Sequence, residues 1–336
     1  MNYVEYMQRA ISSADAFKYT AKPNPVVGAI LVKGNQIISE GAHEKFGSSH
    51  AEINAIEKAK EKIGVTFTSF EELTLICTLE PCSHHGKTGP CADAIIKEGI
   101  KKVIIGSEDP NPLVSGKGIK KLIDNDVIVE FGVCANEVKE QNKHFFYKYE
   151  NGKPYITVKI ASSADGKSHK KNNERTLITS VQSREDVQIV RAEYDAILTG
   201  GNTLIDDNPQ MNARVSFPVN QAKKILLSNK ENIPNNYKFF HNADVEILKE
   251  RNIHKIISHL HNSSINSILV EAGPRLVNAF LMSGLVDEII IYTSPNEIGN
   301  DGVNWFEKEI TVENFGFTLE STYKIESDTK LIYKKC

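Results

Sequence analysis

The stretch from His50 to Cys91 constrains this chain more than any other part of the sequence. A histidine and a glutamate stand at His50 and Glu52, and two cysteines follow at Cys82 and Cys91. One imidazole and two thiolates make a set of three protein ligands for zinc, which leaves the fourth tetrahedral position open for water. Structural zinc sites usually take all four ligands from the protein, so this pattern favours a catalytic metal centre.

Glu52 is predicted to move protons rather than to bind the metal. A carboxylate beside the ion can take a proton from water and deliver it to a substrate. Zinc itself lowers the pKa of a bound water to about 7. The order H-x-E, then P-C and a second C, is the signature of zinc-dependent base deaminases.

The gap between the two cysteines is longer than the C-x-x-C of many such enzymes. His84 and His85 lie inside this gap and are alternative ligands, although His50 fits the pattern better. Lone cysteines are usually small buried hydrophobes, and Cys77 is interpreted that way.

Length and composition indicate a soluble enzyme of two domains. The chain has 336 residues, 40% of them hydrophobic, which supplies enough apolar material for two cores. A net charge of −3 without a long basic run argues against nucleic acid as the main partner. No apolar run reaches the roughly 20 residues that span a bilayer. Five cysteines, two of them with metal-like spacing, indicate a reducing compartment, so we expect a cytoplasmic location.

The first half reads as alternating helices and strands. Apolar periodicity predicts helices over 2–18, 51–63, 90–97 and 119–123, and strands over 26–32, 36–39, 73–79, 103–106 and 127–131. His50 and Glu52 then lie at the start of one helix, and Cys91 in the first turn of another. The chemistry therefore gathers where strands end and helices begin, as in layered α/β folds.

A second α/β pattern follows a boundary. One amphipathic helix is predicted over 136–149 and a turn over 151–154, which separates a first domain, 1–147, from a second, 154–336. Further strands are expected at 155–161, 196–199, 224–228, 245–248, 268–271 and 288–293, with helices at 183–192 and from Pro274 to about Gly284. Glycine-containing turns at 198–203 and 271–275 suit a phosphate, or are ordinary turns. No G-x-G-x-x-G is present in this half, which disfavours a Rossmann domain.

These motifs resemble the bifunctional riboflavin-biosynthesis deaminase–reductases along nearly the whole chain. The first half matches at Pro23–Ala29, His50–Glu52, Thr78–Thr88 and Glu108–Pro112, and the long cysteine spacing belongs to the family pattern. The resemblance implies a cytidine-deaminase-like three-layer domain with zinc on His50, Cys82 and Cys91. It implies that the substrate is contacted by Asn24, His43, His84, Lys87, Asp109 and Asn111.

The implied first reaction is hydrolytic removal of the 2-amino group from 2,5-diamino-6-(5-phosphoribosylamino)pyrimidin-4(3H)-one. Glu52 would protonate the ring and then the departing ammonia. The implied second reaction is reduction of the ribosyl group to ribityl by NADPH, which gives 5-amino-6-(5-phosphoribitylamino)uracil.

The second half resembles the dihydrofolate-reductase-like domain of the same family. The match runs through Ser163–Gly166, Ile178–Ser180, Thr203–Asp207 and Glu271–Pro274. It implies substrate contacts from Lys159, Arg175, Arg191, Met211, Arg214 and Glu271. It implies NADPH contacts from Ala161, Leu177, Thr203, Asp207, Ser228, Gly273, Pro274 and Arg275.

This half also departs from the family pattern. Leu177 stands where a tryptophan is common, Arg175 where a small polar residue is usual, and Met211–Ala213 replaces Leu-Thr-Val. These departures bear on the cofactor and substrate contacts of the second domain, because the loss of an aromatic side chain from a cofactor wall can loosen nicotinamide binding.

Three hypotheses remain. The first is a bifunctional homo-oligomeric enzyme acting on small molecules, with Zn²⁺ and NADPH as cofactors. The second is a single-activity deaminase whose C-terminal domain binds a nucleotide or builds an oligomer. The third is a nucleic-acid-binding protein with a base-editing domain, which the acidic balance disfavours.

Overall fold

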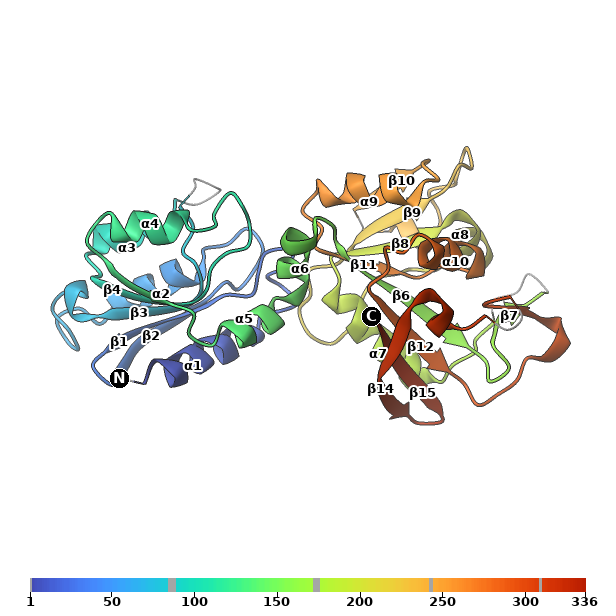
Figure 1. Cartoon of the computed structure of the whole chain (residues 1–336), viewed down its shortest axis with the longest axis horizontal. Helices are drawn as coiled ribbons and strands as arrows, with labels where there is room; N and C mark the ends of the chain where they lie inside the picture. Colours follow the sequence, from blue (N-terminus) through green and yellow to red (C-terminus); the bar gives the residue numbers. More distant parts are fainter. Residues whose placement is uncertain (1, 84–88, 172–175, 242–243, 308–309) are drawn as a thin grey trace. The chain divides into compact units, whose positions relative to one another are not determined.

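The computed structural model has two units, and a mixed β-sheet lies at the centre of the first, Met1–Asn151 (Figure 1). The structure describes residues 2–83, 89–171, 176–241, 244–307 and 310–336. Within these residues the sheet has five strands, in the order β2 (Gln36–Ala42), β1 (Gly28–Lys33), β3 (Thr74–Leu79), β4 (Lys102–Ser107) and β5 (Ile128–Phe131). The last three are parallel, so their carboxyl ends meet at one edge.

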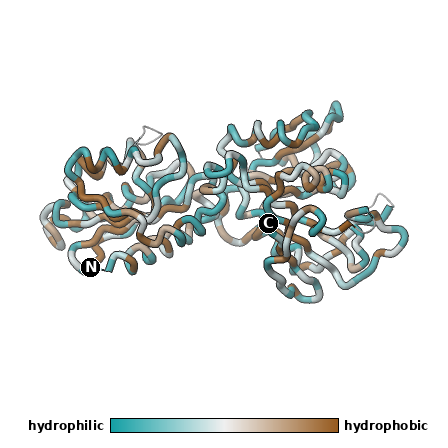
Figure 2. The backbone as a smooth tube through the Cα atoms, in the orientation of Figure 1, coloured by the Kyte–Doolittle hydropathy of each residue, from teal (hydrophilic) through white to brown (hydrophobic). Residues whose placement is uncertain are grey.

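Helices cover both faces of this sheet. One face carries α1 (Tyr3–Asp15) and α5 (Ala135–Gln141); the other carries α2 (Ala51–Lys60), α3 (Cys91–Glu98) and α4 (Lys117–Ile123). Met7 of α1 packs on Ile30 and Ile104, whereas Ala55 of α2 and Ile95 of α3 belong to the core on the opposite face. Figure 2 shows the apolar residues concentrated along the strands between these layers. The first unit is therefore a three-layer α/β/α structure.

The prediction of a single helix over 136–149 is wrong, because the helix is interrupted at Asn142. The chain forms α5, ending at Gln141, and α6 (Lys143–Asn151). The buried Asn142 amide accepts from Val26 N at 2.7 Å and donates to Val26 O at 3.0 Å. An asparagine side chain that pairs with a backbone in this way competes with the helical pattern. The other helices and strands predicted for the first half are confirmed, with shifts of a few residues at their ends.

The second unit, Gly152–Cys336, is built on a longer sheet. Its eight strands among the described residues run in the order β10 (Val245–Leu248), β9 (Lys223–Leu227), β8 (Ala196–Gly200), β11 (Ser267–Val270), β6 (Tyr155–Ser162), β12 (Glu288–Thr293), β15 (Asp328–Lys335) and β14 (Phe317–Ile325). The strands from β10 to β12 are parallel, β15 is antiparallel to β12, and β14 is antiparallel to β15.

Helices again lie on both faces of the sheet. The core on one face includes residues of α7 (Val181–Glu193) and α8 (Gly201–Asp207), and the core on the other includes residues of α9 (Ile253–His261) and α10 (Pro274–Met282). A small sheet pairs β7 (Lys167–Lys170) with β13 (Gly302–Asn304). Short 3₁₀ helices lie at Lys238–Phe240, Gly299–Asp301 and Val312–Phe315 in this unit, and at Phe70–Glu72 in the first unit. None of the helices in the described ranges is long and apolar enough to cross a membrane.

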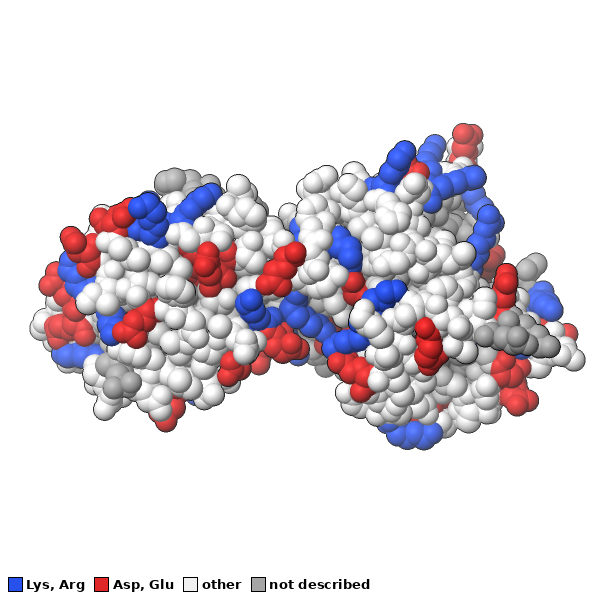
Figure 3. Space-filling view, viewed as in Figure 1, with Lys and Arg blue, Asp and Glu red and all other residues white. Residues whose placement is uncertain are grey.

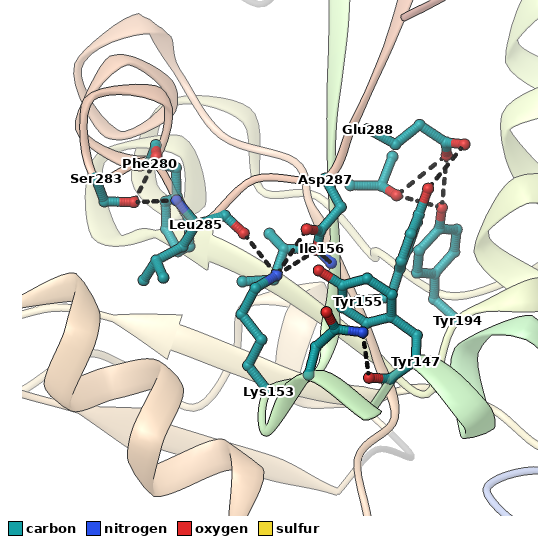
Figure 4. Close-up of polar contacts among 12 residues, drawn as sticks. Tyr147, Lys153, Tyr155, Ile156, Tyr194, Phe280, Ser283, Leu285, Asp287 and Glu288 are labelled. Carbon is teal, nitrogen blue, oxygen red and sulfur yellow. Dashed lines mark hydrogen bonds and ion pairs between the residues drawn. The ribbon is translucent and has the colours of Figure 1, made fainter. Parts of the chain in front are cut away.

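An ion pair anchors the start of the second unit (Figure 4). After the turn at Gly152, which has a φ of 65°, Lys153 Nζ donates to Asp287 Oδ1 at 2.7 Å and to Oδ2 at 2.6 Å. Lys153 also donates to Leu285 O at 3.0 Å, and Asp287 accepts from Ile156 N at 2.9 Å. The first strand of the unit is thereby tied to the segment that precedes β12.

Candidate functional site

The predicted metal ligands converge at the carboxyl edge of the first sheet. His50 is the N-cap of α2, Cys82 follows the end of β3, and Cys91 opens α3. His50 Nδ1 lies 3.6 Å from Cys82 Sγ and 3.3 Å from Cys91 Sγ, and the three ligand atoms all lie within 4.8 Å of one another. Tetrahedral zinc with ordinary bond lengths holds its nitrogen and sulfur ligands about 3.6 Å apart. The arrangement therefore fits one zinc ion.

The surroundings favour the thiolate of Cys82 but not that of Cys91, whose pKa is raised by its hydrogen bond with Cys82 and by burial. A hydrogen bond with Cys91 is the main cause that lowers the pKa of Cys82 to about 4, and the Cys91 backbone N–H donates to Cys82 Sγ at 3.4 Å. Thiolate is the form that binds a metal. Cys77, in contrast, is fully buried in the sheet core, where burial raises its pKa.

Glu52 lies buried beside this centre in the first turn of α2. Its side chain is 3% exposed, and its Oε2 atom has no hydrogen-bond partner among the described residues. Burial raises the pKa of this carboxyl group, and His50 and Cys82 are among the charges that act on it. A buried carboxyl oxygen without a partner costs free energy, so it is expected to bond something that the protein atoms do not supply. A water molecule at the open position of a zinc ion held by His50, Cys82 and Cys91 would meet that need.

Two more predicted residues lie next to the metal centre. The rings of His43 and His50 are 5.5 Å apart, and Asn24 Nδ2 is 3.1 Å from His43 Nε2. His43 Nδ1 lies 3.1 Å from Ser49 O, so the ring carries its proton on Nδ1 and accepts from Asn24 through Nε2. Burial lowers the pKa of His43, which keeps the ring neutral.

Asp109 and Asn111 lie on the loop after β4, at the same edge of the sheet. Asn111 N donates to Asp109 Oδ1 at 2.8 Å, which fixes a tight turn. Burial first, and then the negative charges of Glu80 and Cys82, raise the pKa of Asp109 to about 7. His84 and Lys87, and the alternative ligand His85, lie outside the described residues.

The second unit contains a cavity of about 1470 Å³ beside the carboxyl ends of its parallel strands. Every residue predicted for its substrate or cofactor lines this cavity, except Arg175, which lies outside the described residues. The lining includes Lys159, Ala161, Leu177, Arg191, Thr203, Asp207, Met211, Arg214, Ser228, Glu271, Gly273, Pro274 and Arg275. Residues more than a hundred positions apart in the chain are thus brought to one site.

A buried charge cluster stands on one wall of this cavity. Arg191 binds Glu271 with two hydrogen bonds, Nε to Oε1 at 2.6 Å and Nη2 to Oε2 at 3.0 Å. Lys159 Nζ lies 3.6 Å from Glu271 Oε2. Burial alone would raise the pKa of Glu271, but the charges of Arg191 and Lys159 lower it to about 2. The cluster keeps one net positive charge, which suits an anionic ligand.

The two predicted glycine turns contact other residues that are predicted to bind the cofactor. A Cβ atom on Gly201 would lie 2.6 Å from Ser228 Oγ, so the start of α8 packs directly against the residue that follows β9. Gly273 N donates to Thr203 Oγ1 at 3.2 Å. The turns at 198–203 and 271–275 therefore form adjacent parts of one wall.

Two residues of these sites escaped the sequence analysis. Trp305, the only tryptophan of the chain, lines the cavity and donates from Nε1 to Ala161 O at 2.8 Å. Glu80 is buried two residues before Cys82, where it accepts hydrogen bonds from the loop that carries Asp109. Glu80 lies within the motif Thr78–Thr88, but its hydrogen-bond partners lie on a distant part of the chain and have no signal in the sequence.

Comparisons with known proteins agree with this geometry. Residues 1–107 match the cytidine and deoxycytidylate deaminase zinc-binding region, and residues 154–331 match the RibD C-terminal domain. Riboflavin biosynthesis protein RibD of Aquifex aeolicus is 36% identical, over 95% of this chain and 97% of that protein. The Escherichia coli protein of the same name is 35% identical, over 88% of each chain.

Solved structures give the same result. RibD of Acinetobacter baumannii, form 2, superposes with a TM-score of 0.89 at 33% identity, over 99% of both chains. The diaminohydroxyphosphoribosylaminopyrimidine deaminase/5-amino-6-(5-phosphoribosylamino)uracil reductase of Thermotoga maritima superposes with a TM-score of 0.84, also at 33% identity and 99% coverage of both chains.

The expected cytidine-deaminase-like and dihydrofolate-reductase-like folds are therefore confirmed, and a single-activity deaminase is not favoured. The deaminase half has a zinc-binding domain, and the C-terminal half has the reductase domain of these relatives. On the match of both halves and the identity over nearly its whole length, this chain belongs to the RibD family of bifunctional deaminase–reductases of riboflavin biosynthesis.

Proposed function

We propose that the first unit deaminates 2,5-diamino-6-(5-phosphoribosylamino)pyrimidin-4(3H)-one by hydrolysis. The observation that carries this proposal is the convergence of His50 Nδ1 and two cysteine sulfurs beside the unpartnered Oε2 atom of the buried Glu52. The Thermotoga maritima relative is named for this deamination and for the reduction that follows it.

His50, Cys82 and Cys91 hold the zinc in this proposal. When bound, the ion lowers the pKa of a coordinated water to about 7. Glu52 takes a proton from the attacking water, transfers it to the pyrimidine ring and then assists the departure of ammonia. The pyrimidine and its ribose phosphate are contacted by Asn24, His43, His84, Lys87, Asp109 and Asn111.

The second unit then reduces the ribosyl group of the deaminated product to ribityl. NADPH supplies the hydride, so the protein has to hold and orient cofactor and sugar rather than provide a nucleophile. The cofactor contacts are Ala161, Leu177, Thr203, Asp207, Ser228, Gly273, Pro274 and Arg275. The substrate contacts are Lys159, Arg175, Arg191, Met211, Arg214 and Glu271. The shared cavity and its net positive cluster at Glu271 support this assignment.

We assign the deamination to a domain spanning 1–147 and the reduction to a domain spanning 154–336, on either side of the turn at Gly152. The enzyme acts in the cytoplasm, as a homo-oligomer, on small molecules and not on nucleic acid or a membrane. The net charge of −3 and the mixture of both signs of charge on the visible face of each unit (Figure 3) argue against nucleic acid as a partner.

Two measurements test the proposal. Glu52→Ala should abolish ammonia release from the diaminopyrimidine substrate while the protein still binds one zinc per chain; full deamination by this variant would reject the role of Glu52. Separately, the wild-type protein should oxidise NADPH, seen as a loss of nicotinamide absorbance, when the deaminated substrate is supplied. A folded protein that oxidises no NADPH would refute the second activity.

A further inference from the structure

The carboxylate of Glu80 is buried and accepts four backbone hydrogen bonds. Its Oε1 atom accepts from Gly118 N at 2.8 Å and Ile119 N at 3.1 Å. Its Oε2 atom accepts from Gly116 N at 3.0 Å and Asp109 N at 3.2 Å. The side chain is only 4% exposed.

These four N–H groups match what an ionised carboxylate can accept. Two oxygens offer about four lone-pair sites, and each bond to a charged acceptor is stronger than one between neutral groups. All four donors belong to the segment 109–119, which runs from the end of β4 into the start of α4. One side chain therefore fixes the backbone of that whole segment.

Glu80 also belongs to the segment that delivers a metal ligand. It follows β3 directly and precedes Cys82 by two residues, and its own N–H donates to Ser107 O at 3.0 Å. A Cβ atom on Gly118 would lie 1.9 Å from Pro81 O, so the start of α4 is pressed against the residue between Glu80 and Cys82. The zinc-ligand segment and the segment 109–119 are thus joined by hydrogen bonds and by direct packing.

We propose that Glu80 is a positioning residue for the deaminase substrate. It holds the segment 109–119 against the zinc-ligand segment, which sets Asp109 and Asn111 at a fixed place relative to Cys82. This role rests on the proposed function, because it gives Asp109 and Asn111 their task as substrate contacts. The alternative is that Glu80 only stabilises the fold of the first unit.

Glu80→Gln separates the two roles. Glutamine has nearly the same shape, but its amide N–H₂ would face two of the four backbone donors whichever way it is turned. The segment 109–119 should therefore loosen while His50, Cys82 and Cys91 remain in place. Misplaced contacts weaken the binding of substrate and transition state alike, so we expect the KM for the diaminopyrimidine substrate to rise about tenfold or more. The value of kcat should change much less, since uniform binding is what is lost.

The experiment uses the full-length, zinc-loaded protein and has two readouts besides activity. Zinc content should stay at one ion per chain, and amide hydrogen exchange over 109–119 should become faster than in the wild type. The matched control is Glu130→Gln, because Glu130 is a half-exposed residue on β5 that pairs with Lys102. It should leave KM, zinc content and the exchange of 109–119 unchanged.

An unchanged KM in Glu80→Gln, or a loss of its zinc, would overturn the proposal. If Glu80→Gln does not fold, Glu80→Asp replaces it, because its shorter carboxylate stays charged but cannot reach all four donors; the same outcomes then decide. Failure of the proposed function is a separate result, seen as no ammonia release by the wild type. The exchange measurement needs no turnover, so it tests the hold of Glu80 on the segment in either case.

Discussion

Asp109 carries a charge that the folded protein disfavours. Burial, helped by the nearby charges of Glu80 and Cys82, raises its pKa from 3.8 to about 7. A group whose folded-state pKa is raised in this way binds its proton more tightly in the folded than in the unfolded chain. The free energy of unfolding should therefore fall as the pH rises from about 4 to about 7, the interval between the two pKa values.

Asp109→Asn should remove this pH dependence, because the amide is neutral at every pH and its oxygen can still accept from Asn111 N. At pH 8 the variant should be more stable than the wild type by on the order of 4 kcal/mol, since each unit of pKa shift corresponds to about 1.4 kcal/mol. Below pH 4 the advantage should vanish. Urea unfolding of both proteins at pH 4, 6 and 8 measures this; a difference that stays constant with pH would contradict it.

Glu271 presents the opposite case, because the positive charges of Arg191 and Lys159 stabilise its ionised form and lower its pKa. Its pKa near 2 means that it stays ionised down to strongly acid pH, so its contribution to stability is lost only as the pH falls below about 4.5 toward 2. Glu271→Gln should destabilise the second unit by about 3–5 kcal/mol, because Arg191 and Lys159 would remain buried without their counter-charge.

Denaturant unfolding followed by the fluorescence of Trp305 reports on this unit. The matched control is Glu320→Gln at the surface pair with Lys334, where both side chains are nearly half exposed. Such pairs contribute about 0–1 kcal/mol, so the control should unfold almost as the wild type does. Equal effects of the two substitutions would show that the buried cluster is not a stabilising unit.

At the scale of elements, the sequence predicted best where a local pattern carries the signal. The alternation and turn residues around β1 and β2, and the apolar run of β3, are visible within ten residues of chain. The hairpin β14–β15 was missed, although Phe317, Leu319, Tyr323 and Ile325 stand at alternate positions of β14, most of whose residues are exposed. The helix α9 was missed although Ile253, Ile256, Ile257 and Leu260 have helical spacing and are all buried.

The residues of the candidate site also differ in whether a local sequence pattern predicts them. His50, Glu52, Cys82 and Cys91 form a compact motif whose chemistry can be read without a structure. The partners of Glu80 lie 29 to 39 residues further along the chain, and Trp305 is 144 residues from the carbonyl that it bonds. Contacts of that kind depend on the packing of elements, which no spacing rule supplies.

The missed hairpin holds a helix of the reductase cavity in place. Asp328, the first residue of β15, accepts through Oδ2 from Ser180 N at 2.7 Å and from Ser183 Oγ at 2.6 Å. Both serines stand at the start of α7, which carries Arg191. The side chain thereby ties the C-terminal hairpin to the first turn of this helix.

Asp328→Ala should lower the free energy of unfolding of the second unit by about 1–3 kcal/mol, because it leaves buried donors without an acceptor. It should also raise the KM of the reduction, since α7 positions Arg191 on the cavity wall. Asp328→Asn keeps one oxygen acceptor and should retain most of both properties. Thermal unfolding and steady-state NADPH oxidation measure the two effects; an alanine variant with wild-type values for both would contradict this role.

At the scale of the whole molecule, each unit has its own sheet and its own apolar cores. Among the residues that the structure describes, the cores of the first unit are formed by residues before Gly152, and those of the second by residues after it. The metal ligands belong to the first unit and the large cavity to the second. The stability of each site should therefore depend mainly on its own unit.

Removal of zinc tests this independence. A chelator should abolish ammonia release, because His50, Cys82 and Cys91 lose the ion that acidifies the attacking water, while NADPH oxidation with the deaminated substrate should stay within about twofold. Zinc binds the folded unit and so stabilises it by mass action. Calorimetry should then show a lower unfolding temperature for the first unit and an unchanged transition for the second, and zinc added back should restore both. A parallel loss of NADPH oxidation would mean that the second active site depends on the metal-loaded first unit.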